Sequence, residues 1–164
     1  SPVPVVAAIT GHSPAGGAVL TLYCDYRIMA DGPYRIGLNE TQVGLVVPDV
    51  IQAAMRRLLG AHRAERLMVA GAMIESSEAH RIGLVDELID AEHVVERAIA
   101  WLRDLLRLAP QAMSETRRIA RADLRALFDA HNATSDEAFL ACWFSDEAQR
   151  VLGEMVAMLK AKRG

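Results

Sequence analysis

Two short segments of the chain hold residues whose types and spacing could do acid–base chemistry. Residues 9–20 read ITGHSPAGGAVL, which places Ser13 and the pair Gly16-Gly17 between a β-branched run and an apolar run. Residues 37–48 read GLNETQVGLVVP, which places Glu40 between short apolar runs. Each segment fits both a functional and a purely structural interpretation.

Ser13 has the setting of a serine-hydrolase nucleophile, because it lies between an expected strand and an expected helix. In the G-x-S-x-G motif the backbone N–H of the residue after the serine forms half of the oxyanion hole. Here that residue is Pro14, which has no N–H, and Ala15 stands where the motif has its second glycine. We therefore expect Ser13 to be a loop residue that hydrogen-bonds to nearby backbone. A serine hydrolase remains the least favoured alternative.

Gly16 and Gly17 suit a different chemistry, since they open an apolar helix directly after a strand. The first N–H groups of a helix have no internal partner, and the helix dipole favours negative charge there. Glycine also lets a ligand come close to the backbone. The Gly16 N–H could thus hold a developing oxyanion, although a glycine pair also serves as a plain turn.

Glu40 is the acidic residue of the second segment. A glutamate between apolar runs is either a solvated loop charge or a base whose pKa is raised by desolvation. Taken alone, the residues favour the solvated charge.

Composition narrows the class of protein. The chain has 164 residues and a formal net charge of −3, which gives no electrostatic support for binding nucleic acid or an anionic membrane. No uncharged apolar run approaches the roughly 18 residues of a membrane span, and SPVPVV at the start lacks signal-peptide features. The five histidines lack ligand spacing, so we expect no metal site. Cys24 and Cys142 are expected to be reduced core thiols, which favours a cytoplasmic protein over one with a long-range disulfide.

The pattern along the chain predicts an α/β fold. Strands are expected in residues 3–9, 26–31, 34–38 and 83–89, and the first reads as fully buried. Helices are expected in residues 16–24, 62–70, 76–82 and 92–108, and in residues 51–60, where Asp49 is expected to cap the helix and Gly60 to stop it. Ser114 and Ser145 are expected to cap two later helices.

Together the two segments resemble the enoyl-CoA hydratase/isomerase (crotonase) superfamily. The resemblance rests on PVVAAITG, AGGAVLTLYCD, YRIMAD and LNETQVGLVVP, and it continues through HRAERLMVAG and EAHRIGLVDELI. Within the superfamily, the pattern is most similar to Δ3,Δ2-enoyl-CoA isomerases of mitochondrial type.

The resemblance implies a crotonase-like fold, a β-β-α spiral core with a helical C-terminal region. Residues 1–90 then correspond to the C-terminal part of the spiral core, and residues 91–164 to the helical trimerisation region of a homotrimer or hexamer. The chain resembles the C-terminal two-thirds of a family member. The second oxyanion N–H and much of the adenine pocket are then expected from a region preceding Ser1.

The resemblance also implies an acyl-CoA thioester substrate, with coenzyme A as part of it, and no separate cofactor or metal. Gly16 is expected to supply an oxyanion N–H, Asn39 to contact substrate, and Glu40 to carry a proton from C2 to C4. This would isomerise 3-enoyl-CoA to 2-trans-enoyl-CoA in fatty-acid β-oxidation. Val19 occupies the position of the second glutamate of the hydratases, which disfavours hydration. A hydratase and a non-catalytic acyl-CoA-binding module remain alternatives.

Overall fold

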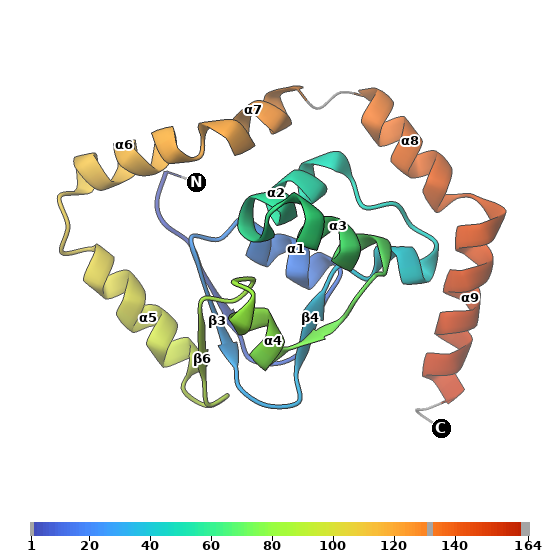
Figure 1. Ribbon diagram of the computed structural model, residues 1–164, viewed down its shortest axis with the longest axis horizontal. Coiled ribbons are helices and arrows are strands. Elements are labelled where there is room, and N and C mark those ends of the chain that lie inside the picture. Colours follow the sequence, from blue (N-terminus) through green and yellow to red (C-terminus); the bar gives the residue numbers. More distant parts are fainter. Residues whose placement is uncertain (1, 131–132, 162–164) are drawn as a thin grey trace.

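A parallel three-stranded sheet forms the base of the fold (Figure 1). The computed structural model describes residues 2–130 and 133–161. The strands of this sheet lie in the order β1 (Val6–Ile9), β3 (Tyr26–Ala30) and β6 (Glu87–Ile89). The central strand β3 is the most deeply buried, and its Ile28, Met29 and Ala30 are 0% exposed. Branched and apolar residues there fill the space between the helices on either face.

A second, smaller sheet carries the two segments of chemical interest. Its strands lie in the order β2 (Ser13–Pro14), β4 (Arg35–Gly37) and β5 (Ile74–Glu75). β2 and β4 are parallel, whereas β4 and β5 are antiparallel. A Cβ on Gly37 would lie 2.1 Å from the backbone oxygen of Ala72, so only glycine permits this close approach.

Short helices cover these sheets and enclose the main apolar core. They are α1 (Gly16–Leu22), the 3₁₀ helix η1 (Glu40–Val43), α2 (Asp49–Leu59), α3 (Ala61–Val69) and α4 (Ser76–Arg81). α2 and α3 pack against each other across a sharp turn at Gly60, whose φ of +75° favours glycine. Their buried faces, with Met55, Ala64 and Met68, close the core over α1.

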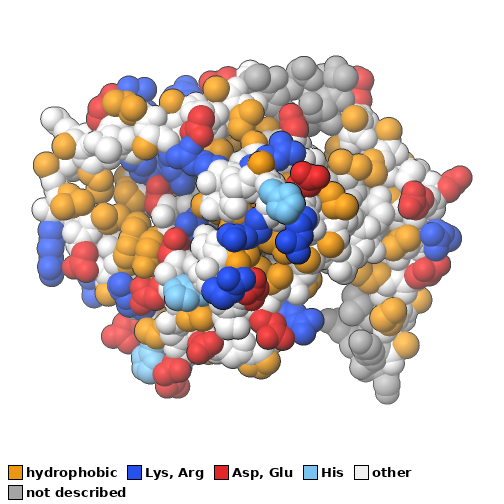
Figure 2. Space-filling view, viewed as in Figure 1, with side chains coloured by type: hydrophobic (Ala, Val, Ile, Leu, Met, Phe, Trp, Pro, Cys, Tyr) orange, Lys and Arg blue, Asp and Glu red, His pale blue; other side chains and the backbone are white. Residues whose placement is uncertain are grey.

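The C-terminal helices form an arc around this core (Figure 1). They are α5 (Val94–Leu105), α6 (Pro110–Ala120), α7 (Ala122–Ala130), α8 (Ala133–Trp143) and α9 (Asp146–Ala161). α5 packs on β1 and β3 through Val94 and Ala98. Large apolar side chains are exposed along the arc, and Figure 2 shows such side chains on its α5–α6 side. Those of α5 to α9 and their connections include Val95, Ile99, Leu106, Leu108, Ile119, Leu127, Phe128, Leu140, Trp143, Phe144, Val156 and Met158. Within the described residues, no helix is both long enough and apolar enough to cross a bilayer.

A buried ion pair fastens β3 to the turn before β6. The Arg27 side chain is 6% exposed, and its Nη2 lies 2.7 Å from Asp86 Oδ2. The same oxygen accepts a hydrogen bond from the Arg27 backbone N–H at 2.8 Å. Arg27 Nη1 donates to the backbone oxygen of Cys24 at 3.1 Å, and Arg27 Nε is buried without a partner. Among the described residues, Asp86 is the one carboxylate that pairs with the Arg27 guanidinium.

Several predicted elements are confirmed, and some details are corrected. Ser145 does cap α9, because its Oγ accepts a hydrogen bond from the Ala148 N–H at 3.2 Å. Ser114 is no cap: it lies inside α6, which begins at Pro110, a residue suited to the first helical position because it has no N–H. Asp49 is the first residue of α2 rather than its cap.

The strand predicted in residues 83–89 is shorter, and the first strand is less buried, than the apolar runs indicated. The N–H groups of Leu84 and Val85 both donate to the Ala79 oxygen, so this part of the run wraps the end of α4. β1 is an edge strand in which only Ile9 is buried. Cys24 and Cys142 are free thiols, as predicted, but both are half-buried rather than in the core.

Candidate active site

Parallel pairing of β2 and β4 brings the two segments together. Ser13 lies opposite Ile36, and Pro14 lies opposite Gly37. The carboxyl ends of neighbouring parallel strands lie at the same edge of a sheet. The turn at Gly16 and the segment that begins η1 therefore leave the sheet side by side. A hydrogen bond from the Ala15 N–H to the Gly37 oxygen at 3.0 Å extends the pairing beyond β2.

The backbone before α1 is turned so that the first N–H groups of the helix are open. Ala15 has φ 44° and ψ −117°, a conformation that L side chains rarely adopt. Its carbonyl accepts a hydrogen bond from the Val19 N–H at 2.9 Å, the first bond of the helical pattern. A Cβ on Gly16 would meet nothing within 4 Å, so there is room for a ligand beside this residue.

Ser13 faces the interior rather than the open side of the loop. It belongs to β2, not to a loop as predicted, and it is 7% exposed. A Cβ on Gly17 would lie 2.9 Å from Ser13 Oγ, so the hydroxyl lies directly beneath that glycine. Burial adds to the missing N–H of Pro14 as a reason against a nucleophilic role.

Glu40 is buried, so the interpretation as a solvated loop charge is wrong. It is the first residue of η1 and is 9% exposed. Its Oε2 is buried and has no hydrogen-bond partner. Burial raises the pKa of this carboxyl above its ordinary value, and a hydrogen bond from its own backbone N–H offsets only part of that effect. A carboxyl with a raised pKa and a free acceptor atom is suited to exchange protons with a ligand.

Asn39 adds a second unsatisfied acceptor next to Glu40. It is half-buried, and its Oδ1 is buried without a hydrogen-bond partner. A buried polar atom without a partner costs about 1–3 kcal/mol. Two such atoms on adjacent residues indicate a place where a ligand supplies the missing donors. The sequence marked Asn39 as a contact only through the family pattern, and nothing in its own neighbourhood predicts this burial.

Val19 lies on the first turns of α1, three residues after Gly16. It is half-buried and packs against the main core. The first turn of α1 carries no acidic residue. The candidate site thus has the Glu40 carboxyl and no second carboxyl from the first turn of α1.

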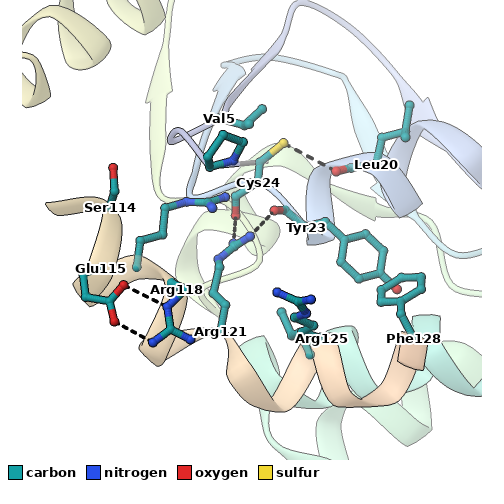
Figure 3. Close-up of a pocket in the computed structure, with 13 residues that line it drawn as sticks. Val5, Leu20, Tyr23, Cys24, Ser114, Glu115, Arg118, Arg121, Arg125 and Phe128 are labelled. Atoms are coloured by element: carbon teal, nitrogen blue, oxygen red, sulfur yellow. Dashed lines mark hydrogen bonds and ion pairs between the residues drawn. The ribbon is translucent and has the colours of Figure 1, made fainter. Parts of the chain in front are cut away.

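A cavity of about 860 Å³ lies elsewhere, between the end of α1 and the helices α6 and α7 (Figure 3). Its arginines are engaged in structural contacts. Arg118 Nε lies 2.8 Å from a Glu115 carboxylate oxygen, and Arg121 donates to the backbone oxygens of Tyr23 and Cys24 at 2.7 and 3.0 Å. The Arg118 pair lies within α6, whereas the Arg121 bonds join the connection between α6 and α7 to the end of α1. In the described ranges, no group of three His, Cys, Asp or Glu side chains could hold a metal ion.

Structural comparison identifies the class of protein. The chain superposes on the crystal structure of human mitochondrial Δ3,Δ2-enoyl-CoA isomerase with a TM-score of 0.93 and 31% identity, over 100% of this chain and 64% of that one. An enoyl-CoA hydratase/isomerase of Pseudoalteromonas atlantica has the same fold, with a TM-score of 0.86 at 22% identity over 96% of this chain and 63% of that one. The structure is therefore a crotonase fold, as the sequence predicted.

Sequence comparison then gives the family. The family model described as enoyl-CoA hydratase/isomerase matches residues 1–161, and the chain belongs to that family. Human mitochondrial enoyl-CoA delta isomerase 1 is 31% identical over 161 residues, which are 98% of this chain and 53% of that protein. A probable enoyl-CoA hydratase of Mycobacterium avium is 34% identical over 132 residues, 80% of this chain and 49% of that protein. The chain spans about half the length of the curated relatives it matches.

Proposed function

We propose that this chain supplies the base and one oxyanion donor of an enzyme that isomerises 3-enoyl-CoA to 2-trans-enoyl-CoA. The observation that carries the proposal is the Glu40 carboxyl, which is nine-tenths buried and has an unpartnered Oε2, on the segment that follows β4 at the sheet edge where the Gly16 turn follows β2. Similarity to an isomerase, human enoyl-CoA delta isomerase 1, supports the choice of reaction.

In this mechanism Glu40 moves one proton between two carbons of the substrate. The ionised carboxylate removes a proton from C2, and the C–H electron pair forms an enolate whose negative charge rests on the thioester oxygen. The protonated carboxyl then returns the proton at C4, and the double bond moves from C3–C4 to C2–C3. The raised pKa of Glu40 helps both steps, because the group must accept the proton and then release it near neutral pH.

The Gly16 N–H holds the enolate oxygen in this proposal. Preorganised backbone donors are worth about 2.7–4 kcal/mol each in oxyanion holes of this kind. The open space beside Gly16 gives the thioester access to the N–H, and the unpartnered Oδ1 of Asn39 accepts a hydrogen bond from the bound acyl-CoA.

Isomerisation is favoured over hydration because α1 presents Val19 in place of a second carboxylate. An apolar side chain neither holds nor activates a water molecule. The 34% identity to a probable hydratase makes water addition the second candidate reaction, and both reactions can be followed with the same protein.

The proposal also includes the substrate class, the cellular location and the oligomeric state. The substrate is an acyl-CoA thioester, coenzyme A enters only as part of it, and the protein works in the cytoplasm without another cofactor. The exposed apolar side chains along α5 to α9 support a homotrimer or hexamer, because large apolar surfaces on this scale mark interfaces between subunits.

The test is an isomerase assay on the longest natural form of the protein with Glu40→Gln beside it. Appearance of the conjugated 2-enoyl thioester is followed by its ultraviolet absorbance. We expect Glu40→Gln to lower kcat by at least about 100-fold, as for loss of a general base. Glu65→Gln, an exposed position on α3, is the matched control and should retain the wild-type rate.

Near-wild-type isomerisation by Glu40→Gln would refute the mechanism. Water addition to 2-enoyl-CoA at a rate that rivals isomerisation would favour the hydratase instead. Tight acyl-CoA binding without any turnover by the wild type would favour the non-catalytic module.

A further inference from the structure

The 3₁₀ helix that begins with Glu40 ends against α9 in backbone-to-backbone contact. Gly44 follows η1 with a φ of +75°, and a Cβ there would lie 2.9 Å from Ala148 Cα and 3.3 Å from Ala148 N. Ala148 is 0% exposed. Figure 1 shows the segment between β4 and α2 lying beside α9. The two backbones thus touch where any larger side chain, on either partner, would force them apart.

Hydrogen bonds at the connection between α8 and α9 hold Ala148 and Gly44 in this contact. Cys142 Sγ donates to the Gly44 oxygen at 3.5 Å, which joins the end of α8 to the same residue. The Ser145 hydroxyl accepts from the Ala148 N–H and donates to the Cys142 oxygen at 2.7 Å. Ala148 is therefore fixed on the first turn of α9 by the cap of that helix.

The opposite side of η1 is held equally closely by the turn after α3. Thr41 Oγ1 donates to the Met68 oxygen at 3.3 Å. Gly71 has a φ of +57°, and a Cβ there would lie 2.6 Å from Thr41 Oγ1 and 2.8 Å from Gln42 Cγ. η1 is thus held between α9, which contacts Gly44, and this turn, which contacts Thr41 and Gln42.

Displacement of Gly44 would reach Glu40 through the backbone. The Leu45 N–H donates to the Glu40 oxygen at 3.0 Å, and the Gly44 N–H donates to the Thr41 oxygen at 3.3 Å. These two bonds link Gly44 and Leu45 to the first residues of η1. A shift of the backbone at Gly44 is therefore transmitted to Glu40.

We propose that Ala148 on α9 is a positioning residue for Glu40, holding η1 against the core so that the carboxyl stays buried. This inference rests on the proposed function only for its effect on catalysis. It gives α9 a role within its own chain that is separate from the subunit contacts expected for the C-terminal helices.

Desolvation determines the direction in which the Glu40 pKa should change. Desolvation is the dominant cause of the raised Glu40 pKa, and no charged side chain among the described residues contributes to it. A side chain larger than alanine at position 148 pushes Gly44 outward and lets water reach Glu40. The Glu40 pKa then falls towards about 4.3, the ordinary value of a glutamate.

The primary test is a titration of the Glu40 carboxyl carbon, followed by NMR in wild type, Ala148→Leu and Ala157→Leu. Ala157 is an exposed alanine on the same helix, so Ala157→Leu matches the substitution without touching η1. We expect the Glu40 pKa to fall in Ala148→Leu and to stay unchanged in Ala157→Leu. Ala148→Val, a smaller change, should give an intermediate fall and serves if Ala148→Leu does not fold.

The second readout is the pH profile of isomerisation. In Ala148→Leu the acidic limb of kcat/KM should move to lower pH with the Glu40 pKa, and the plateau should drop by about 10- to 100-fold through misplacement of the base. A variant that merely loses stability lowers the plateau without moving the limb. An unchanged Glu40 pKa in a folded Ala148→Val or Ala148→Leu would overturn the inference. Because the NMR titration needs no activity, a wild type that fails to isomerise would refute the proposed function and leave this inference to be judged by the titration.

Discussion

Removal of Asp86 should destabilise the protein more than removal of its partner Arg27. In Asp86→Ala the guanidinium of Arg27 keeps its charge in a site where the side chain is 6% exposed. The Arg27 backbone N–H loses its acceptor as well. Leaving a buried charge without its partner costs about 3–5 kcal/mol.

The opposite variant, Arg27→Met, leaves a carboxylate that water can still reach. The Asp86 side chain is 26% exposed and keeps its hydrogen bond from the backbone N–H of residue 27. The loss is then mainly that of a charged hydrogen bond, about 1.5–3 kcal/mol. The double variant should be more stable than Asp86→Ala alone, because it carries no uncompensated positive charge.

Urea unfolding at fixed protein concentration, with a common slope for all variants, measures these differences. For a chain of this length 1 kcal/mol corresponds to about 2–4 °C in Tm, so Asp86→Ala should melt about 6–20 °C below wild type. If Asp86→Ala were no less stable than Arg27→Met, the Arg27 charge would be hydrated in solution and the reasoning from burial would be refuted.

Two further results are expected from Glu40 and from Gly37. The acidic limb of the kcat/KM profile should lie above the ordinary glutamate pKa of about 4.3. The reason is that burial raises the Glu40 pKa and the group must be ionised to act as a base. A limb at or below that value would contradict the assignment of Glu40 as the base. With the native pKa raised, the contribution of Glu40 to stability is present at low pH and is lost as the pH rises through the native pKa, so Glu40→Gln should flatten this decline in Tm. Gly37→Ala should lose about 1–3 kcal/mol or more and also isomerase activity, because its Cβ would lie 2.1 Å from the Ala72 oxygen. Gly153→Ala on α9, where nothing lies within 4 Å of the added Cβ, is the control for an added methyl group, and an equal loss in thermal melts would show that the close approach is unimportant.

Sequence periodicity predicted the helices around Gly60 to within a residue or so, because amphipathic spacing and a glycine stop are local signals. Sequence periodicity gave the wrong element where apolar residues are buried outside a strand. Leu84 and Val85 are apolar because they are buried in the turn after α4, yet on sequence grounds they extend a strand. Ser114 is a good cap residue in a place where Pro110 had already begun the helix.

Prediction of the candidate site would have required strand pairings that leave no local pattern in the sequence. β2 has two residues and β4 has three, too few to show alternation, yet their register brings Gly16 and Glu40 to one edge. The residues around Glu40 alone favoured a solvated charge, and only the family pattern pointed to a buried base. The helix η1 that carries Glu40 packs against α3 and α9, which lie later in the chain, so no window of sequence around Glu40 could reveal its surroundings.

The conformation of Ala15 has a consequence for how stable this protein can become. An alanine held at φ 44° and ψ −117° carries about 1–3 kcal/mol of backbone strain, against a total folding stability of about 5–15 kcal/mol for a typical domain. The same conformation leads directly into Gly16, which begins α1 and is exposed. In the proposed mechanism, selection for thermal tolerance and selection for oxyanion binding therefore act in opposite directions on this single residue. A relaxed backbone at position 15 in a relative would then predict loss of the Gly16 oxyanion donor.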